Sequence, residues 1–460
     1  MQEYTLIAKT FQGLEEVLAQ ELTELGANEI EIGKRMVSFT GDKEMMYRAN
    51  FCLRTAVRIL KPIHTFSART PDEVYDVIKA MDWTQYIRLG QTFSIDATVY
   101  SSEFRNSRFV TYRVKDAIVD FFQEKEGRRP NISLTNPDIR INIHIAEKEC
   151  TLSLDSSGES LHMRGYRTAS VEAPINEVMA AAMIKMSGWQ ADCDLIDPFC
   201  GSGTIAIEAA LIARNIYPGV FRQKFGFENW PDFDADLLDR IYNDDSQERD
   251  FHHHIYGYDL NKNAVAAAEE NVKNAGVRDV VTLKQMNFQD FHQPKEKALI
   301  ITNPPYGERL RSGVTELYEM IGERLKHEFV GGEAWIICSR EELFDAIGMR
   351  PSFRVLLQNG ALDCELRKYQ IFDGSMKEFK TSGKFIKTDD ERRRMTEQSR
   401  RFSRANDFKK EARQAPAEQV PETEEERAER QKYNLLRRHH NEFEQRRNPK
   451  PQRPYGKPRH

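Results

Sequence analysis

The chain has 460 residues, enough for about three globular domains at the usual ~100–200 residues each. Its 40% apolar residues can form buried cores, while 30% charged residues and a mean hydropathy of -0.65 indicate additional solvated chain. The net charge of -5 hides an asymmetry: residues 381–460 contain 22 Lys+Arg and 14 Asp+Glu, whereas residues 1–380 contain 45 and 58. A uniformly basic nucleic-acid binder is therefore excluded, but one that uses a local patch or a basic tail is not.

The six cysteines indicate a reducing compartment. They lie far apart, with neither a C-x-x-C pair nor a histidine at ligand spacing, which predicts free thiols in the cytoplasm rather than disulfides or zinc. The N-terminus lacks the pattern of a signal peptide, and no run of about 18 apolar residues predicts a membrane span. Side chains at His252 to His254 would point alternately from a strand, so we expect no metal site there.

The first 155 residues predict two small α+β modules, residues 1–50 and 51–155. Apolar residues alternate along short stretches, which predicts strands, and recur at helical spacing between them. Neither module contains a catalytic motif. The predicted elements are strands at Tyr4–Ala8, Met36–Phe39, Phe93–Val99, Arg140–Ile145 and Cys150–Leu154, and helices over residues 14–25 and 110–121.

A basic segment precedes the second of these helices. Residues 101–108 include Phe104 and Arg108, and Arg113 follows within the helix. Basic residues beside an aromatic side chain at a helix entrance can bind phosphates. The same composition is typical of a solvated helix start, and the spacing alone favours that second interpretation.

Residues 174–378 predict an α/β domain after a linker over residues 156–173. Strands alternate with helices and end in a hairpin, which predicts an open, doubly wound sheet of Rossmann-like architecture. Residues 379–460 have few apolar side chains and many charges, so we expect a basic, largely disordered tail. The seven predicted strands are Asp194–Asp197, Ile255–Asp259, Val280–Met286, Ala298–Thr302, Glu333–Cys338, Arg354–Leu357 and Glu365–Ile371.

A glycine-rich turn follows the first strand of this domain. Gly201 and Gly203 lack side chains, so the backbone can approach a ligand at the carboxyl end of the sheet, and Thr204 opens the next helix. The turn also satisfies G-x-G-x-x-A, the dinucleotide fingerprint, and a purely structural turn would explain it equally well. The preceding Asp197 favours a ligand with an ammonium or hydroxyl group over a pyrophosphate.

The next strand ends in Asp259, whose carboxylate is placed to accept two hydrogen bonds from a ribose diol. Its distance from the glycine turn exceeds the ~20 residues of a dinucleotide fold. We interpret the excess, residues 215–251, as an insertion over the sheet edge. Its aromatic side chains could line a base pocket, although packing the insertion down is their commoner use.

The motif Asn303-Pro-Pro-Tyr306 follows the fourth strand. Two prolines restrict the backbone and remove two donors, which leaves the Asn303 side-chain oxygen and the Pro304 carbonyl as acceptors. Together they suit an exocyclic amine with two N–H groups. The Tyr306 ring offers a surface on which a base can stack, worth ~1–3 kcal/mol per base. A structural loop is the alternative.

These motifs together resemble a known family. Residues 197–204 with residues 303–310 look like a class I S-adenosylmethionine-dependent amino-methyltransferase. Residues 115–120 resemble a THUMP domain, an RNA-binding module, behind a ferredoxin-like N-terminal unit. The resemblance covers about residues 1–375 and is to the N-terminal half of the fused RlmL-type 23S rRNA guanine-N2 methyltransferases. Further residues that carry it are 161–167, 173–178 and 359–364.

The resemblance implies roles for matched positions. The turn from Asp197 to Thr204 would hold the methionine part of the cofactor, and Asp259 its ribose. Asn287 and Phe288 fall where an acidic residue and its neighbour bracket the adenine in the family, so an uncharged Asn287 puts cofactor affinity in question. The second methyltransferase domain of the fused enzymes does not follow. The implied residues are Asp197, Pro198, Phe199, Gly201, Gly203, Thr204, Asp259, Asn287 and Phe288 for the cofactor, and Asn303, Pro304 and Tyr306 for the target amine.

The resulting hypothesis is methyl transfer to guanine N2 in 23S rRNA or a large-subunit precursor, with the basic tail on RNA phosphates. Adenine-N6 methylation of DNA or RNA is the nearest alternative, because the same loop suits both amines. A non-catalytic ribosome-assembly factor that binds RNA through the N-terminal modules and tail is a second alternative. An NAD-dependent oxidoreductase rests on the glycine pattern alone.

Overall fold

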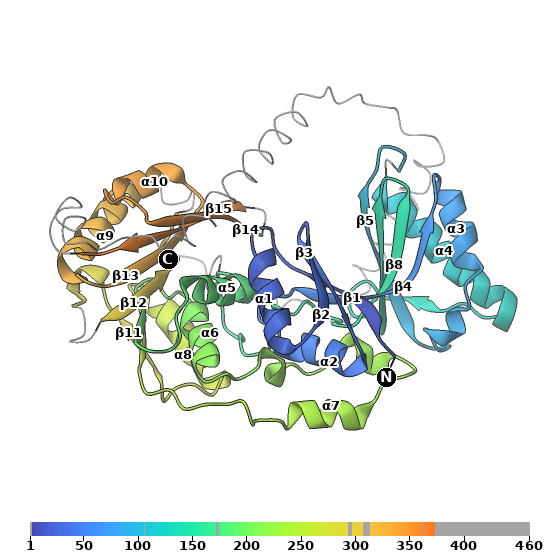
Figure 1. Ribbon diagram of the computed structural model, residues 1–460, viewed down its shortest axis with the longest axis horizontal. Coiled ribbons are helices and arrows are strands. Elements are labelled where there is room, and N and C mark those ends of the chain that lie inside the picture. The colour runs from blue at the N-terminus through green and yellow to red at the C-terminus, as the bar shows by residue number, and fades with distance from the viewer. Residues whose placement is uncertain are drawn as a thin grey trace, which may run out of the picture. The chain divides into compact units, whose positions relative to one another are not determined.

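Two β-sheets organise the computed structural model, which describes residues 2–104, 106–171, 174–292, 297–306, 313–360 and 362–372 (Figure 1). The first sheet has eight strands in the order β2-β3-β1-β4-β8-β7-β5-β6, and the second has seven in the order β11-β10-β9-β12-β13-β15-β14. Both belong to one compact unit. The tail predicted for residues 379–460 lies outside the described residues.

The first sheet is formed by the N-terminal 155 residues. Its strands pair antiparallel except for β5, which runs parallel to β6 and β7. Strand β4 pairs with β1 on one side and with β8 on the other, so the two predicted modules share one continuous sheet. The strands are β1 Tyr4–Lys9, β2 Asn28–Gly33, β3 Met36–Gly41, β4 Arg58–Ser67, β5 Thr92–Tyr100, β6 Asn131–Ile132, β7 Ile139–Ala146 and β8 Glu149–Asp155.

Four helices share one apolar core with this sheet. Their buried side chains pack against the alternate strand residues that point to the same face, such as Leu6 and Phe39. The Asn106 side chain caps α4 by accepting from the Arg108 and Phe109 amides, and Arg113 pairs with Asp72 at 2.6 Å. The basic segment is therefore a capped helix start. The helices are α1 Glu15–Leu25, α2 Lys43–Cys52, α3 Pro71–Lys79 and α4 Ser107–Glu126.

The second sheet confirms the predicted seven-stranded, doubly wound architecture. Strands β11, β10, β9, β12 and β13 run parallel, and β15 is antiparallel to both β13 and β14. The strand order reverses between β9 and β12, which is where such sheets bind ligands beyond the carboxyl ends of the strands. The strands are β9 Asp194–Asp197, β10 Ile255–Asp259, β11 Val281–Gln285, β12 Ala298–Thr302, β13 Glu333–Cys338, β14 Phe353–Asn359 and β15 Leu362–Gln370.

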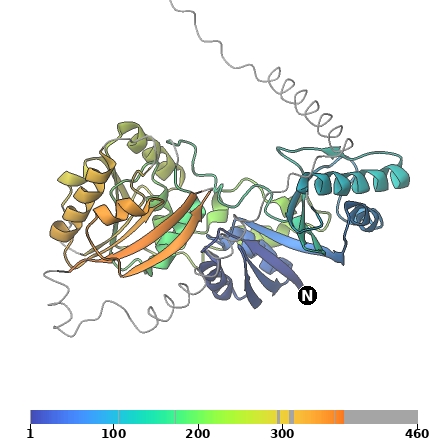
Figure 2. The ribbon, with the colours of Figure 1, turned by 90° about the horizontal axis from the view of Figure 1, so that it is seen from above.

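Helices cover both faces of this sheet (Figure 2). Helices α5, α6 and α8 contribute to the core on one face, and α9 and α10 to the core on the other. Burial on both faces explains why these strands read as short, continuous apolar runs. The helices are α5 Glu177–Ser187, α6 Thr204–Ala213, α8 Lys262–Asn274, α9 Val314–Glu328 and α10 Glu341–Ala346.

The insertion between α6 and β10 packs elsewhere than predicted. Its aromatic residues Phe225, Phe227 and Trp230 belong to the core of the eight-stranded sheet, and Phe227 stacks on Tyr47 of α2 at 4.0 Å between ring centroids. Most of these aromatic side chains therefore pack on the N-terminal half rather than over the edge of the seven-stranded sheet, whereas Phe221 packs against the core of that sheet. Its helical elements are η2 Pro218–Phe221, η3 Gly226–Asn229 and α7 Ala235–Tyr242.

The segment predicted as a linker buries the side chains of Leu161, Arg164 and Tyr166. The Arg164 guanidinium donates to the Arg54 carbonyl oxygen at 2.5 Å and to Glu208 of α6 at 3.3 Å. The Tyr166 hydroxyl donates to the same Glu208 carboxylate at 2.9 Å. The linker thus joins the N-terminal half to the helix that follows the glycine turn.

Candidate functional site

The three strands at the point where the strand order reverses end in the polar residues singled out from the sequence. Strand β9 lies between β10 and β12, with Gly257 opposite Asp197 and Ile300 opposite Ile196. Asp197 and Asp259 are the last residues of β9 and β10, and Asn303 directly follows β12. The parallel strands therefore bring these three side chains, which are far apart in the chain, to one edge of the sheet.

The glycine turn has a left-handed backbone at both of its glycines. Gly201 and Gly203 adopt φ angles of 52° and 82°, a region that side-chain-bearing residues rarely adopt. A Cβ atom on Gly203 would also lie 3.0 Å from the Cβ of Ala268 in α8. Helix α6 begins at Thr204, so the turn presents its backbone N–H groups towards the carboxyl ends of the strands.

Asp259 holds this turn directly. One oxygen of its carboxylate accepts from the Gly201 amide at 3.0 Å, and the other accepts from the Asn261 amide at 2.8 Å. Each carboxylate oxygen can accept two hydrogen bonds, so the partly exposed Asp259 retains capacity for a ligand hydroxyl.

Asp197 is the most perturbed carboxyl group of the site. Its side chain is 1% exposed, and burial raises its pKa to about 7, with a further small increase from the Asp259 charge. One oxygen accepts from the Thr302 hydroxyl at 2.7 Å and from the Phe199 amide at 3.2 Å. Pro198 is buried beside it, and Phe199 is half-buried. A buried carboxylate without a cationic partner is costly, and such groups are typical of functional sites.

The Asn303 side chain presents an unsatisfied acceptor. Its Oδ1 atom is buried and has no hydrogen-bond partner among the described residues. Buried polar atoms are almost always paired in folded proteins, so an orphan acceptor at a strand end requires an explanation. An incoming N–H donor provides one.

Tyr306 is anchored below the loop. Its ring packs against the apolar core, and its hydroxyl is hydrogen-bonded to Asn359 and Cys364, at the ends of β14 and β15. Burial raises the pKa of Tyr306 well above its usual value, so its hydroxyl stays protonated. Pro304 is buried, and residues 307–310 of the predicted motif lie outside the described residues.

The two residues expected near the adenine differ in exposure. The Asn287 side chain is partly exposed, and it caps η4, Phe288–Asp290, by accepting from the Gln289 amide at 3.1 Å. Phe288 is 2% exposed and contacts Phe199 edge-on, with 5.8 Å between ring centroids. Phe199 thus lies between this core aromatic and the glycine turn.

Sequence reasoning missed two contributors to the site. Thr302 is 1% exposed and donates to Asp197, and its place immediately before Asn303 was the available signal. Asn271 of α8 is fully buried and accepts from the Thr168 and Ala169 amides while donating to the Ser202 carbonyl at 3.0 Å. It ties the linker to the glycine turn, and nothing in its sequence context announces this.

A polar cavity of about 450 Å³ lies away from these strand ends. It is lined by residues of α1, α2 and the insertion, together with Arg54 and with Lys185 of α5. Glu21 and Glu24 already pair with Lys185. We place the functional site at the strand ends, because the perturbed carboxyl group and the orphan acceptor are there.

Family comparisons agree with the division of the chain. Residues 5–60 match the RlmL ferredoxin-like domain, residues 68–155 the THUMP domain, and residues 164–368 the RMKL-like methyltransferase domain. A putative RNA methyltransferase from Synechocystis sp. is 38% identical over 369 residues, which cover 79% of this chain and 96% of that protein. The chain belongs to the THUMP-containing, RMKL-like methyltransferase family.

Other members of this methyltransferase family differ in length. A ribosomal RNA large subunit methyltransferase K/L from Syntrophotalea carbinolica is 39% identical over 374 residues, which are 78% of this chain and 52% of that protein. The chain therefore spans about half the length of the K/L relatives.

Two solved structures share the fold of this methyltransferase. A putative methyltransferase crystallised with S-adenosylhomocysteine matches with a TM-score of 0.72 and 34% identity, over 82% of this chain and 100% of that one. A predicted N6-adenine-specific DNA methylase from Listeria monocytogenes matches with a TM-score of 0.72 and 31% identity, over 81% of this chain and 97% of that one.

Within the described part of the chain, no helix is both long and apolar enough to span a membrane. The same residues contain no group of three His, Cys, Asp or Glu side chains suited to a metal ion. Of the histidine run, His253 lies 3.7 Å from Asp194, and the His254 ring contacts the Thr282 hydroxyl. All six cysteines are free thiols.

Proposed function

We propose that this methyltransferase transfers a methyl group from S-adenosylmethionine to the exocyclic N2 amine of a guanine in 23S rRNA. The observation that carries the proposal is the buried Asn303 Oδ1 atom at the strand end beside the glycine turn, which has no hydrogen-bond partner in the described part of the chain. Membership of the methyltransferase family supports the reaction type. The names of the K/L relatives support the choice of large-subunit rRNA.

The residues around the glycine turn can be compared with the chemical groups of S-adenosylmethionine. S-adenosylmethionine supplies an activated methyl group on a sulfonium, together with an ammonium, a ribose diol and an adenine. The left-handed turn at Gly201 and Gly203 exposes backbone N–H groups, and Asp197 offers a buried carboxylate for a cation. Asp259 has acceptor capacity for the diol, and Asn287 and Phe288 would bracket the adenine. The site therefore fits the cofactor.

The loop after β12 would bind and orient the amine. A guanine amino group is a poor nucleophile, because its lone pair is delocalised into the ring. Asn303 Oδ1 and the Pro304 carbonyl would accept hydrogen bonds from its two N–H groups, which favours a pyramidal nitrogen and stabilises the positive charge that develops on it. The methylated nitrogen would then release one proton to solvent. Tyr306 would stack on the base once it has left its helix or loop. Alignment of the amine with the methyl group supplies most of the remaining acceleration.

Replacement of Asn303 by Ala tests the proposal. We expect kcat on rRNA to fall by about 10²–10³-fold, the range seen when one electrostatic contact to a transition state is removed. Binding of S-adenosylhomocysteine, measured by calorimetry, should stay unchanged, since the turn is untouched. Equal losses of binding and turnover would instead assign the loop a structural role.

Mass spectrometry of rRNA nucleosides identifies the product. Cells that lack the protein should lose N2-methylguanosine from 23S rRNA and regain it with the wild type but not with Asn303→Ala. An unchanged N2-methylguanosine content would refute the guanine assignment. N6-methyladenine that is lost in cells without the protein and restored by the wild type would favour the adenine alternative. The name of the Listeria neighbour also suggests that alternative.

The partner and the cellular location complete the proposal. The THUMP domain and the basic residues 381–460 would bind rRNA or a precursor particle in the cytoplasm, with the tail adding salt-sensitive affinity. The boundaries at 1–50, 51–155, 156–173, 174–378 and 379–460 remain predictions. Ribosome association that survives Asn303→Ala would indicate an additional assembly role.

A further inference from the structure

One buried hydrogen bond joins the two halves of the site. The Thr302 hydroxyl donates to Asp197 Oδ1 at 2.7 Å, and both side chains are 1% exposed. Thr302 ends β12, directly before the amine-binding residue Asn303, and Asp197 ends β9, directly before the glycine turn. The two strands are neighbours, so this bond links the loop for the target amine to the turn for the cofactor.

Few other contacts hold the Asp197 carboxylate. On its own segment the Phe199 amide donates to the same oxygen atom, and the Cys200 thiol lies near it with a pKa raised by burial. From β10 the Asp259 carboxylate faces it and repels its charge. Among the described residues, the groups that act on the Asp197 charge thus include no cationic side chain.

We propose that Thr302 is a positioning residue for methyl transfer, which holds the Asp197 carboxylate between the cofactor turn and the target-amine loop. The inference rests on the proposed function, since it assigns Asp197 to the cofactor ammonium. The Thr302 hydroxyl and the Phe199 amide both donate to Asp197 Oδ1, and these two hydrogen bonds fix the direction in which Oδ2 points. The orientation of the carboxylate therefore depends on the Thr302 hydroxyl. Without that hydroxyl, the hydrogen bond is lost between Asp197, which precedes the glycine turn, and Thr302, which precedes Asn303.

The charge of Asp197 depends on the same contact. Burial raises its pKa to about 7, and the Thr302 hydroxyl opposes this rise by bonding to the charged form. Loss of the hydroxyl therefore raises the pKa further, so more of the protein carries a neutral carboxyl group at neutral pH. A neutral carboxyl group binds an ammonium poorly, and cofactor affinity should decline from a higher pH than in the wild type.

Three variants of the full chain test this inference. Thr302→Val is isosteric but lacks the hydroxyl, and Thr302→Ser restores it. Thr55→Val is the matched control, because Thr55 is fully buried and donates to the Glu21 carboxylate at 2.5 Å in the N-terminal half. S-adenosylhomocysteine binding by calorimetry across the neutral pH range gives, for each protein, the pH at which affinity is half lost.

We expect this midpoint to rise by about one pH unit in Thr302→Val, the equivalent of one hydrogen bond to a charged group. It should return in Thr302→Ser and stay at the wild-type value in Thr55→Val. The kcat of Thr302→Val at high pH, where Asp197 is ionised, should remain reduced, since the loop has lost its link.

The outcomes separate the inference from the proposed function. A wild type that binds no S-adenosylhomocysteine refutes the function itself. A wild type that binds and methylates, with an unshifted midpoint in Thr302→Val, overturns the inference. If Thr302→Val fails to fold, Asp197→Asn decides: its affinity should be low and independent of pH across this range, and a retained pH dependence would also overturn the inference.

Discussion

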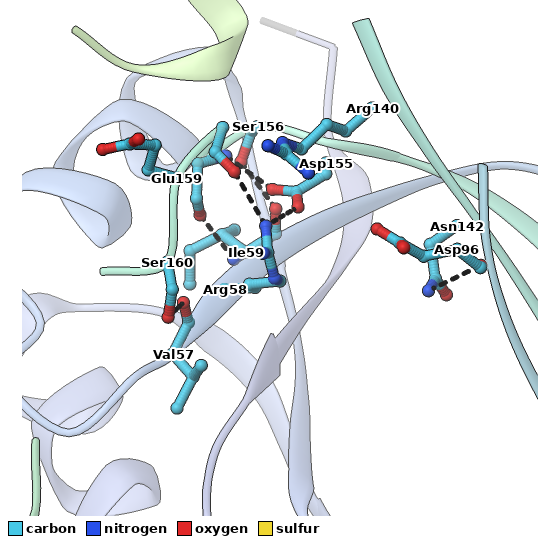
Figure 3. A network of polar contacts seen from close by, with 12 residues as sticks. Val57, Arg58, Ile59, Asp96, Arg140, Asn142, Asp155, Ser156, Glu159 and Ser160 are labelled. Carbon is cyan, nitrogen blue, oxygen red and sulfur yellow. Dashed lines mark hydrogen bonds and ion pairs between the residues drawn. The ribbon is translucent and has the colours of Figure 1, made fainter. Parts of the chain in front are cut away.

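Two buried aspartates, one in each sheet, show how differently this methyltransferase treats the same side chain. Asp155 ends β8 and is 3% exposed, and Arg58 of β4 forms an ion pair with it (Figure 3). The Ser157 amide also donates to Asp155 at 2.9 Å. Asp197 ends β9 and is 1% exposed, and it has a threonine hydroxyl, an amide and a second carboxylate as neighbours.

The difference separates structure from function. Burial raises the pKa of both groups, but for Asp155 the Arg58 charge is the strongest opposing influence. A buried carboxylate that is paired with a cation is typical of a structural ion pair. A buried carboxylate without a cationic partner is typical of a site that binds a cation from outside. We therefore interpret Asp155 of the eight-stranded sheet as a structural residue and Asp197 of the seven-stranded sheet as part of a ligand site.

The largest effect should come from removal of the compensating cation. Arg58→Ala leaves Asp155 buried without its partner, and we expect a loss of about 3–5 kcal/mol in the free energy of unfolding. The loss should be greatest at high pH, where Asp155 must be charged. Thermal unfolding followed over pH provides the measurement. A loss in the free energy of unfolding no larger than the ~1 kcal/mol of an exposed ion pair would show that Asp155 is solvated. The contrast between Asp155 and Asp197 would then be wrong.

A smaller effect of opposite sign should follow at the uncompensated site. The folded-state pKa of Asp197 is raised, so its contribution to stability is complete below the unfolded pKa and declines as pH rises through about 7. Asp197→Asn removes this penalty, and the ligand-free variant should be more stable than the wild type by a few kcal/mol above pH 7. The two proteins should converge near pH 4. A variant that is less stable than the wild type at pH 8 would contradict the assignment.

The smallest effect should come from the like charge beside Asp197. Asp259 adds a minor part of the pKa increase, so Asp259→Asn should lower the pH at which Asp197 ionises by a few tenths of a unit. The stability profile of the ligand-free protein reports this shift without involving the proposed ribose contact. A shift towards higher pH would mean that the hydrogen bond that the Gly201 amide donates to Asp259 matters more than the Asp259 charge.

Much of the catalytic half was predictable from local pattern. The seven strands were predicted within a few residues, because parallel strands buried on both faces are apolar runs between turn residues. The grouping of Asp197, Asp259 and Asn303 at one edge followed from the doubly wound topology.

The N-terminal half was harder to predict. Strand β4 was missed, because its residues from Arg58 to Ser67 are mostly half-buried and contain Pro62, so no clean alternation appears. The insertion was placed over the wrong surface, since aromatic side chains reveal that they will be buried but not against which partner. Phe227 found Tyr47, which lies 180 residues earlier in the chain.

The sequence by itself determined the residue types at the strand ends, the glycine turn and the acceptor loop, because each depends on neighbours within a few positions. Only the tertiary structure decided which of those groups are compensated. Burial and pairing depend on residues distant in the chain: Arg58 neutralises Asp155, whereas Asp197 meets Thr302 and Asp259. The charge asymmetry of the whole chain says nothing of this, since a pKa depends on the few groups within hydrogen-bonding and Coulombic reach.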